Sequence, residues 1–164
     1  MAKAQFLLET GFSSQDDLDA AVNAVHVDLQ NTRAALKTIE AEIAEKKELQ
    51  KWVISYGKTR DVRDGLKTIK SEKKRAEYRA DHESDFIIAD SAVRYFKSHG
   101  ITKIPSYKAL QAEIERLIAE KNAAYNAYHE QQSRYNELAT IQHNLAALHG
   151  EPTPDKPKKQ EHTI

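Results

Sequence analysis

The chain has 164 residues, about the size of one domain. It contains five glycines and four prolines, and three of those prolines fall within residues 151–164. Sheet proteins need turns rich in these residues, so the composition disfavours sandwiches, barrels and many-stranded α/β folds and favours long helices. With 25 basic and 25 acidic residues the formal net charge is zero, which excludes a uniform attraction to nucleic acid or to membranes. The absence of cysteine excludes disulfides, thiol nucleophiles and cysteine–zinc sites.

The first residues, MAKAQFLLETGF, lack the basic stretch, apolar run and small-residue cleavage site of a secretion signal. No stretch of the sequence approaches the roughly 18 apolar residues that cross a bilayer. We therefore expect a cytoplasmic protein without membrane insertion.

A first heptad pattern predicts a long helix in the N-terminal third of the chain. Ser14 is expected to cap this helix, because Asp16 and Asp17 follow in the turn where acidic side chains favour a helix start. Apolar residues, with one threonine among them, then recur alternately four and three residues apart, as in a coiled-coil seam. The seam positions are Leu18, Val22, Val25, Leu29, Thr32, Leu36, Ile39 and Ile43.

A second heptad pattern predicts another long helix from Ser106 to His149. Ser106 follows Pro105 and is expected to cap its start, and Gly150 is expected to end it. The seam positions are Leu110, Ile114, Leu117, Lys121, Ala124, Tyr128, Gln131, Tyr135, Leu138, Gln142 and Leu145.

Neither helix can bury its stripe alone, so the sequence predicts an all-α fold, an antiparallel coiled-coil hairpin of two long helices with short helices packed at the ends. In the expected register Leu18 faces Leu145 and Val25 faces Leu138. The polar residues Thr32 and Gln131 then lie opposite each other, which would set the register. We expect one helical coiled-coil domain over residues 1–150 and a disordered tail over residues 151–164.

The segments that precede the two seams resemble each other. Each has a short apolar helical stretch, a glycine (Gly11 or Gly100), an apolar residue, a serine and then the seam. This order predicts that a glycine at a helix C-terminus joins a short helix to each long one, in a pseudo-two-fold design.

The region between the seams, from about Ser55 to Ser84, is a basic bend. Gly57 and Gly65 weaken a helix there by about 1 kcal/mol each without forbidding it. Between Lys46 and Arg79 there are twelve basic and five acidic residues. This excess predicts a phosphate-binding surface, with Tyr56 and Tyr78 placed to stack on bases. The candidate residues are Lys58, Arg60, Arg63, Lys67, Lys70, Lys73, Lys74, Arg75 and Arg79. A solvated helix laced with salt bridges is the alternative.

Known catalytic motifs are absent from the sequence. It has no glycine-rich phosphate loop, no Gly-x-Ser-x-Gly elbow and no zinc-binding histidine pair, so we expect no metal, no cofactor and no enzymatic activity. His26 is interpreted as a residue on the flank of the seam, and Tyr125, Tyr128 and Tyr135 as packing residues. Trp52 is expected to anchor the bend against the second long helix, unless it is exposed at a partner site.

Four blocks of sequence resemble the helical C-terminal region of MobA/MobL-type relaxases, the mobilisation proteins of bacterial conjugative plasmids and transposons. The blocks are WVISYGKTRD (52–61), YRADHESDFII (78–88), IPSYKALQAE (104–113) and AEKNAAYNAY (119–128). They occur in one order, and the resemblance covers residues 5 to 149. The catalytic tyrosine and the histidine cluster of the nicking domain have no counterpart here, so no catalytic residue is carried over.

The resemblance implies a non-catalytic region accessory to DNA mobilisation, acting through contacts with the DNA backbone or with relaxosome and coupling proteins. The alternative is a coiled-coil scaffold for protein interactions that binds no nucleic acid. A homodimer also stays open, because a seam that is satisfied within a hairpin can equally be satisfied between chains.

Overall fold

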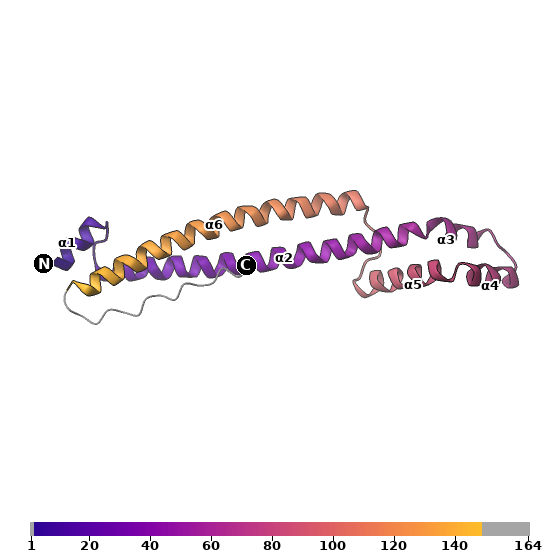
Figure 1. The fold of residues 1–164 in the computed structure, drawn as a ribbon, viewed down its shortest axis with the longest axis horizontal. Helices are drawn as coiled ribbons and strands as arrows, with labels where there is room; N and C mark the ends of the chain where they lie inside the picture. Colours follow the sequence, from indigo (N-terminus) through magenta and orange to yellow (C-terminus); the bar gives the residue numbers. More distant parts are fainter. Residues whose placement is uncertain (1, 149–164) are drawn as a thin grey trace. The chain divides into compact units, whose positions relative to one another are not determined.

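The computed structural model describes residues 2–148. Helices make up 86% of the chain and no strand occurs among the described residues, so the predicted all-α class is confirmed (Figure 1). The two long helices, α2 and α6, pack against each other as a helical hairpin. The elements in chain order are α1 (Ala2–Glu9), α2 (Gln15–Lys58), α3 (Arg60–Lys67), α4 (Glu72–Asp81), α5 (Glu83–Ser98) and α6 (Tyr107–Ala147).

Both long helices begin with the predicted serine cap. The backbone N–H of Asp17 donates to Ser14 Oγ at 3.1 Å, and that of Ala109 donates to Ser106 Oγ at 3.1 Å. In each case the hydroxyl satisfies a backbone donor that has no carbonyl partner in the first turn of a helix.

The chain divides into two compact units, residues 2–40 with 119–148 and residues 41–118. In the first unit, α1 and the two seams enclose an apolar core. Leu18 and Leu138 are fully buried, Leu145 is nearly so, and Leu7 of α1 packs into the same cluster. A second cluster of this unit surrounds Tyr128. Every leucine of the two predicted seams is therefore buried, while several other seam residues, such as Val25 and Ile39, are half-buried.

Polar pairs fix the register of this unit. Thr32 Oγ1 donates to Gln131 Oε1 at 2.8 Å, which confirms the predicted opposition of the two residues. Gln142 Nε2 donates to Asp19 Oδ1 at 2.8 Å near the end of the seam. Because a shift by one heptad would leave these groups facing apolar side chains, the pairs select one alignment of the two helices.

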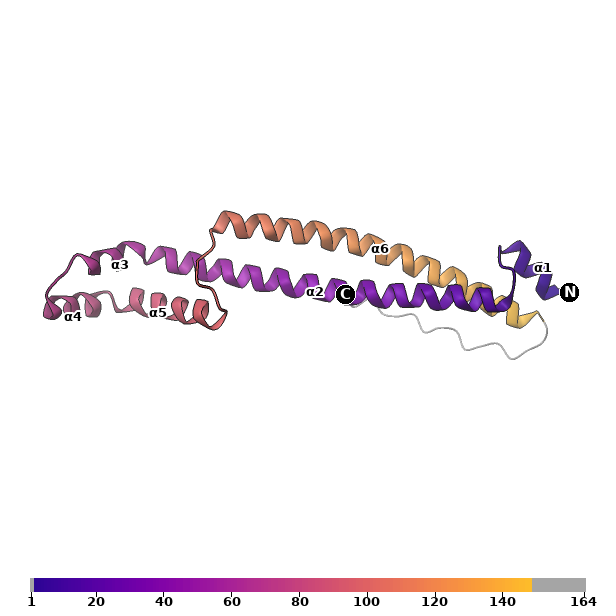
Figure 2. The same ribbon diagram turned by 180° about the vertical axis from the view of Figure 1, so that it is seen from behind.

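The second unit joins the C-terminal part of α2 to α3, α4, α5 and the start of α6. Gln50 Nε2 donates to Gln111 Oε1 at 2.9 Å, and Lys46 Nζ forms an ion pair with Glu113 Oε2 at 3.0 Å. Helix α5 runs alongside the last turns of α2 in both views (Figures 1 and 2). Its buried residues are Phe86, Ala89, Ala92 and Phe96, which recur every three or four residues and so form one stripe along the helix.

The two glycine joints have the same hydrogen-bond pattern. Gly11 has φ +89° and Gly100 has φ +66°, the left-handed region that glycine enters without steric cost. After α1, Phe12 N–H donates to Leu7 O at 2.8 Å and Gly11 N–H donates to Leu8 O at 3.1 Å. After α5, Ile101 N–H donates to Phe96 O at 2.9 Å and Gly100 N–H donates to Lys97 O at 3.1 Å. Both joints are Schellman motifs, so the predicted glycine caps are confirmed.

The boundaries of the bend differ from the prediction at one point. Helix α2 continues to Lys58 instead of ending near Ser55, and it includes Gly57. Gly65 lies inside α3, so both glycines of the bend are helical, and the charged stretch that follows forms α4. Helix α6 ends at Ala147, while His149, Gly150 and the predicted disordered tail lie outside the described residues. The single domain over residues 1–150 stays a prediction.

Within residues 2–148, none of the helices combines the length and the apolar character required to cross a lipid bilayer.

A disulfide across the seam tests the register. The chain has no natural cysteine, so Thr32→Cys with Gln131→Cys should cross-link within one molecule on mild oxidation, because these side chains are in contact. The control pair, Thr32→Cys with Ala124→Cys, should not close. Ala124 lies two helical turns from Gln131, about 10 Å along the axis, beyond the reach of a disulfide. Non-reducing electrophoresis and mass spectrometry distinguish the pairs, and a cross-linked dimer from the first pair would contradict the hairpin.

Substitutions of two glycines should change stability in opposite directions. Gly100→Ala should lower the free energy of unfolding by about 1–2 kcal/mol, because alanine is strained at a positive φ. Gly57→Ala should raise it by up to about 1 kcal/mol, because Gly57 is helical and an added methyl group meets no atom within 4 Å. Chemical denaturation measures both changes, and equal shifts would contradict the assigned cap.

Candidate nucleic-acid interface

The nine predicted site residues all lie in the unit formed by residues 41–118. Lys58 ends α2, Lys70 lies between α3 and α4, and the others belong to these two helices. Between Lys58 and Arg79 there are nine basic and four acidic residues. This segment therefore carries an excess of positive charge, but its nine basic side chains have different contacts and different roles.

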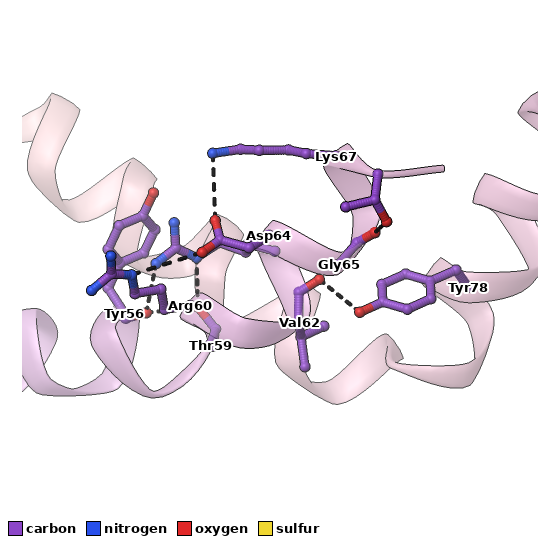
Figure 3. Close-up of polar contacts among 10 residues, drawn as sticks. Tyr56, Thr59, Arg60, Val62, Asp64, Gly65, Lys67 and Tyr78 are labelled. Carbon is purple, nitrogen blue, oxygen red and sulfur yellow. Dashed lines mark hydrogen bonds and ion pairs between the residues drawn. The ribbon is translucent and has the colours of Figure 1, made fainter. Parts of the chain in front are cut away.

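Arg63 helps to hold the junction of α2 and α3 together. Its Nε donates to Thr59 Oγ1 at 2.9 Å and its Nη2 donates to Tyr56 O at 3.1 Å. Its guanidinium also lies 3.6 Å from the centroid of the Tyr56 ring. Thr59 itself is only 1% exposed and donates to Tyr56 O at 2.7 Å (Figure 3). Since these contacts use the side chain internally, Arg63 has a structural role at the junction of α2 and α3.

Arg75 has a similar internal role in the turn between α3 and α4. Its Nη1 donates to Leu66 O at 2.8 Å and to Ile69 O at 2.9 Å, carbonyls at and just beyond the end of α3. The guanidinium of Arg79 lies 4.8 Å from the Phe86 ring centroid, a cation–π distance. Both arginines therefore link α4 to the helices before and after it.

Arg60 and Lys67 share one carboxylate. The distances to Asp64 are 3.8 Å from Arg60 Nε and 3.6 Å from Lys67 Nζ, and all three side chains are more than half exposed (Figure 3). Exposed pairs of this kind contribute between zero and about 1 kcal/mol, so a phosphate can compete with Asp64 for either cation.

The remaining four candidates are lysines without an internal partner. Their side chains are exposed and form no hydrogen bond or ion pair with any residue of the described part of the chain. They are Lys58, Lys70, Lys73 and Lys74. We call them the lysine set, and they are the cations best placed to bind an external anion.

Tyr56 and Tyr78 are not placed to stack on bases as predicted. The Tyr56 ring packs edge-on against Phe96 at 5.7 Å, and the Arg63 guanidinium covers it at 3.6 Å. Tyr78 contacts the rings of His82 and Phe86, and its hydroxyl donates to Val62 O at 2.8 Å (Figure 3). Both rings are used to fold the bend.

Trp52 contacts a different helix from the one predicted. Its ring stacks on Tyr95 of α5 at 5.3 Å with an interplanar angle of 20°, and its Nε1–H donates to Glu48 Oε1 at 3.1 Å. The prediction that it packs against the second long helix is therefore wrong. The pKa of Tyr95 is raised by desolvation and by the negative charges of Glu48 and Glu45.

A groove lies between the last turns of α2 and the start of α5, with a volume of about 470 Å³. Its lining combines apolar surface, hydroxyls, one carboxylate and two lysines. The residues are Lys51, Trp52, Ser55, Lys58, Thr59, Asp85, Ile87, Ile88 and Ser91. Ile87 and Ile88 are 57% and 41% exposed, although they follow Phe86 in an unbroken apolar run. The sequence analysis did not identify this groove. A signal for it was present, because helical periodicity places both isoleucines off the buried stripe of α5.

No group of three histidine, aspartate or glutamate side chains is arranged to hold a metal ion among residues 2–148. His26 is half-buried beside Tyr135, at 6.0 Å between ring centroids. Tyr125 donates to Glu40 Oε1 at 3.2 Å, and desolvation and that carboxylate raise its pKa. These residues pack at the seam, as predicted.

A double-mutant cycle tests how the bend is packed. A methyl group at Gly65 would collide with the Tyr78 hydroxyl and come within 3.0 Å of its Cζ atom. Gly65→Ala should therefore raise stability less than the open-helix control Gly57→Ala. In a Tyr78→Phe background the hydroxyl is gone, and we expect Gly65→Ala to gain about 1 kcal/mol relative to its effect in the wild type. Equal effects in both backgrounds, measured by chemical denaturation, would contradict the contact.

The chain was compared with known protein families, with curated proteins and with solved structures, and none of the three comparisons found a match. The resemblance to mobilisation relaxases therefore stays a prediction based on the four sequence blocks.

Proposed function

We propose that this chain is the non-catalytic helical region of a mobilisation relaxase of the MobA/MobL type, and that it binds the DNA backbone through the lysine set. The observation that carries the proposal is that Lys58, Lys70, Lys73 and Lys74 are exposed and have no internal partner within residues 2–148. Arg60 and Lys67, held only by exposed pairs with Asp64, can add to the same surface.

The lysines suit a sequence-independent contact. An ammonium group binds phosphate as a point charge and displaces condensed counterions, which makes the affinity fall as salt rises. Arg63 and Arg75, two of the arginines that could read a base bidentately, are instead used inside the bend. We therefore propose that the lysine set holds DNA without selecting a sequence.

A salt titration with matched variants tests the proposal. The change is Lys→Gln at the four members of the lysine set. The probe is a fluorescently labelled single strand, and anisotropy is measured over a range of salt. Because each lost phosphate contact lowers the dependence of log K on log salt by about 0.7, the slope should fall by up to about 3.

The control carries the same loss of charge at four other exposed lysines. They are Lys37, Lys97, Lys103 and Lys108. This control should bind with the slope of the wild type. Helix content and melting temperature should be unchanged in both variants, because all eight side chains are exposed and none forms a hydrogen bond or ion pair among residues 2–148. Equal loss in the two variants would show that only net charge matters, and no binding by the wild type would refute the proposal.

A protein-interaction scaffold is the second candidate. It is favoured by two exposed isoleucines that line the groove between α2 and α5, Ile87 and Ile88, which are 57% and 41% exposed. Apolar side chains gathered at one surface are typical of a binding site for another molecule. Binding of a coupling protein that survives substitution of the lysine set would favour this function over DNA binding.

A further inference from the structure

The groove between α2 and α5 has the properties of a small-ligand site. Its volume of about 470 Å³ lies within the range of roughly 300–1,000 Å³ typical of such sites. A groove of this volume accommodates a ligand of one or two rings.

The apolar part of the lining suits a flat ring. Trp52 is held against Tyr95 by the stacked contact and by its bond to Glu48, so its orientation is set before any ligand binds. Ile87 and Ile88 present their apolar side chains to solvent across the same groove. A planar ligand that covered them would remove this apolar surface from water.

The polar part of the lining has charges that match a nucleotide. Lys51 and Lys58 are exposed, form no ion pair among residues 2–148 and lie seven residues apart on α2, which puts them on one face about 10 Å apart. The hydroxyl of Ser55 and the carboxylate of Asp85 lie in the same groove. Two cations beside an apolar site with a few hydrogen-bonding groups are the combination that holds a base by its ring and the flanking backbone by its phosphates.

We propose that this groove binds one unpaired nucleobase of a DNA single strand, with Lys51 and Lys58 contacting the flanking phosphates. This inference rests on the proposed function, because Lys58 belongs both to the lysine set and to the groove. A base inside a duplex is stacked on its neighbours and cannot enter such a site without being extruded. The groove therefore gives the surface a preference for single strands, which the lysine set alone does not provide.

Asp85 adds a preference among the bases. A carboxylate only accepts hydrogen bonds, so it favours a base with an exocyclic amino group. Cytosine, adenine and guanine have such a group and thymine has none. The single negative charge in the lining thus selects against thymine at this one position.

The fluorescence of Trp52 reports directly on the groove, because it is the only tryptophan of the chain. We expect oligo(dC) of about 12 nucleotides, a length that covers one such site, to quench it. A duplex of equal charge should bind more weakly and leave the emission unchanged. Unchanged emission on saturation with oligo(dC) would overturn the inference.

Paired substitutions separate the groove from the lysine set. Ile87→Gln with Ile88→Gln removes apolar walls without changing charge, and should weaken oligo(dC) binding about tenfold while leaving duplex affinity and the salt slope unchanged. The control is Leu8→Gln with Val27→Gln, two residues that are 73% and 51% exposed and lie outside the groove. It should bind as the wild type does. Circular dichroism checks that both variants keep their helix content.

The two proposals fail in different ways. Salt-dependent binding with no effect of the isoleucine substitutions would overturn the groove and leave the proposed function standing. The groove would also be overturned if the wild type bound single strands and duplexes with equal affinity and lost this binding only when the lysine set was replaced. The proposed function would again stand. For Asp85, the wild type should prefer oligo(dC) to oligo(dT) and Asp85→Ala should abolish that preference. Equal binding of the two oligonucleotides by the wild type would contradict the role of the carboxylate.

Discussion

The fold depends on two long helices that share one apolar seam. Each helix alone exposes a stripe of leucine, isoleucine and valine, so neither is stable without the other. The polar pairs set the alignment. Thr32 bonds to Gln131 in one compact unit and Gln50 bonds to Gln111 in the other, and each pair is satisfied only in one register. Helices α1 and α5 pack against these helices, and α4 is in turn held by contacts with α3 and α5.

Most of the fold could be predicted because its signals are local. The heptad spacing identified the buried leucines, and the capping serines and the glycines at positive φ marked where helices begin or end. The end of α2 was harder to place, because Gly57 weakens a helix without ending it. At the junction with α3 the side chains of Thr59 and Arg63 form local hydrogen bonds, Thr59 with Tyr56 O and Arg63 with Thr59 Oγ1, which no residue propensity indicates.

The candidate site was only partly predictable, since charge in a sequence does not show which charges are used internally. Arg63 and Arg75 form hydrogen bonds with backbone carbonyls that their own fold brings near, and no spacing rule marks such contacts. The lysines lack these contacts, in keeping with the weaker fit of an ammonium group to two acceptors at once. Trp52 was assigned to the wrong helix because the heptad pattern describes α2 and α6 and contains no information on where α5 packs.

The seam also has a consequence for how such a chain can evolve. A coiled coil constrains two positions in seven, and constrains them by hydropathy more than by identity. The other five can drift while the backbone stays the same. The rare polar interruptions are different, because replacing one member of the Thr32–Gln131 pair leaves the other without a partner at the seam. Distant relatives of this chain should therefore be recognised by where polar residues interrupt the heptads, a signature that survives after overall sequence identity has been lost.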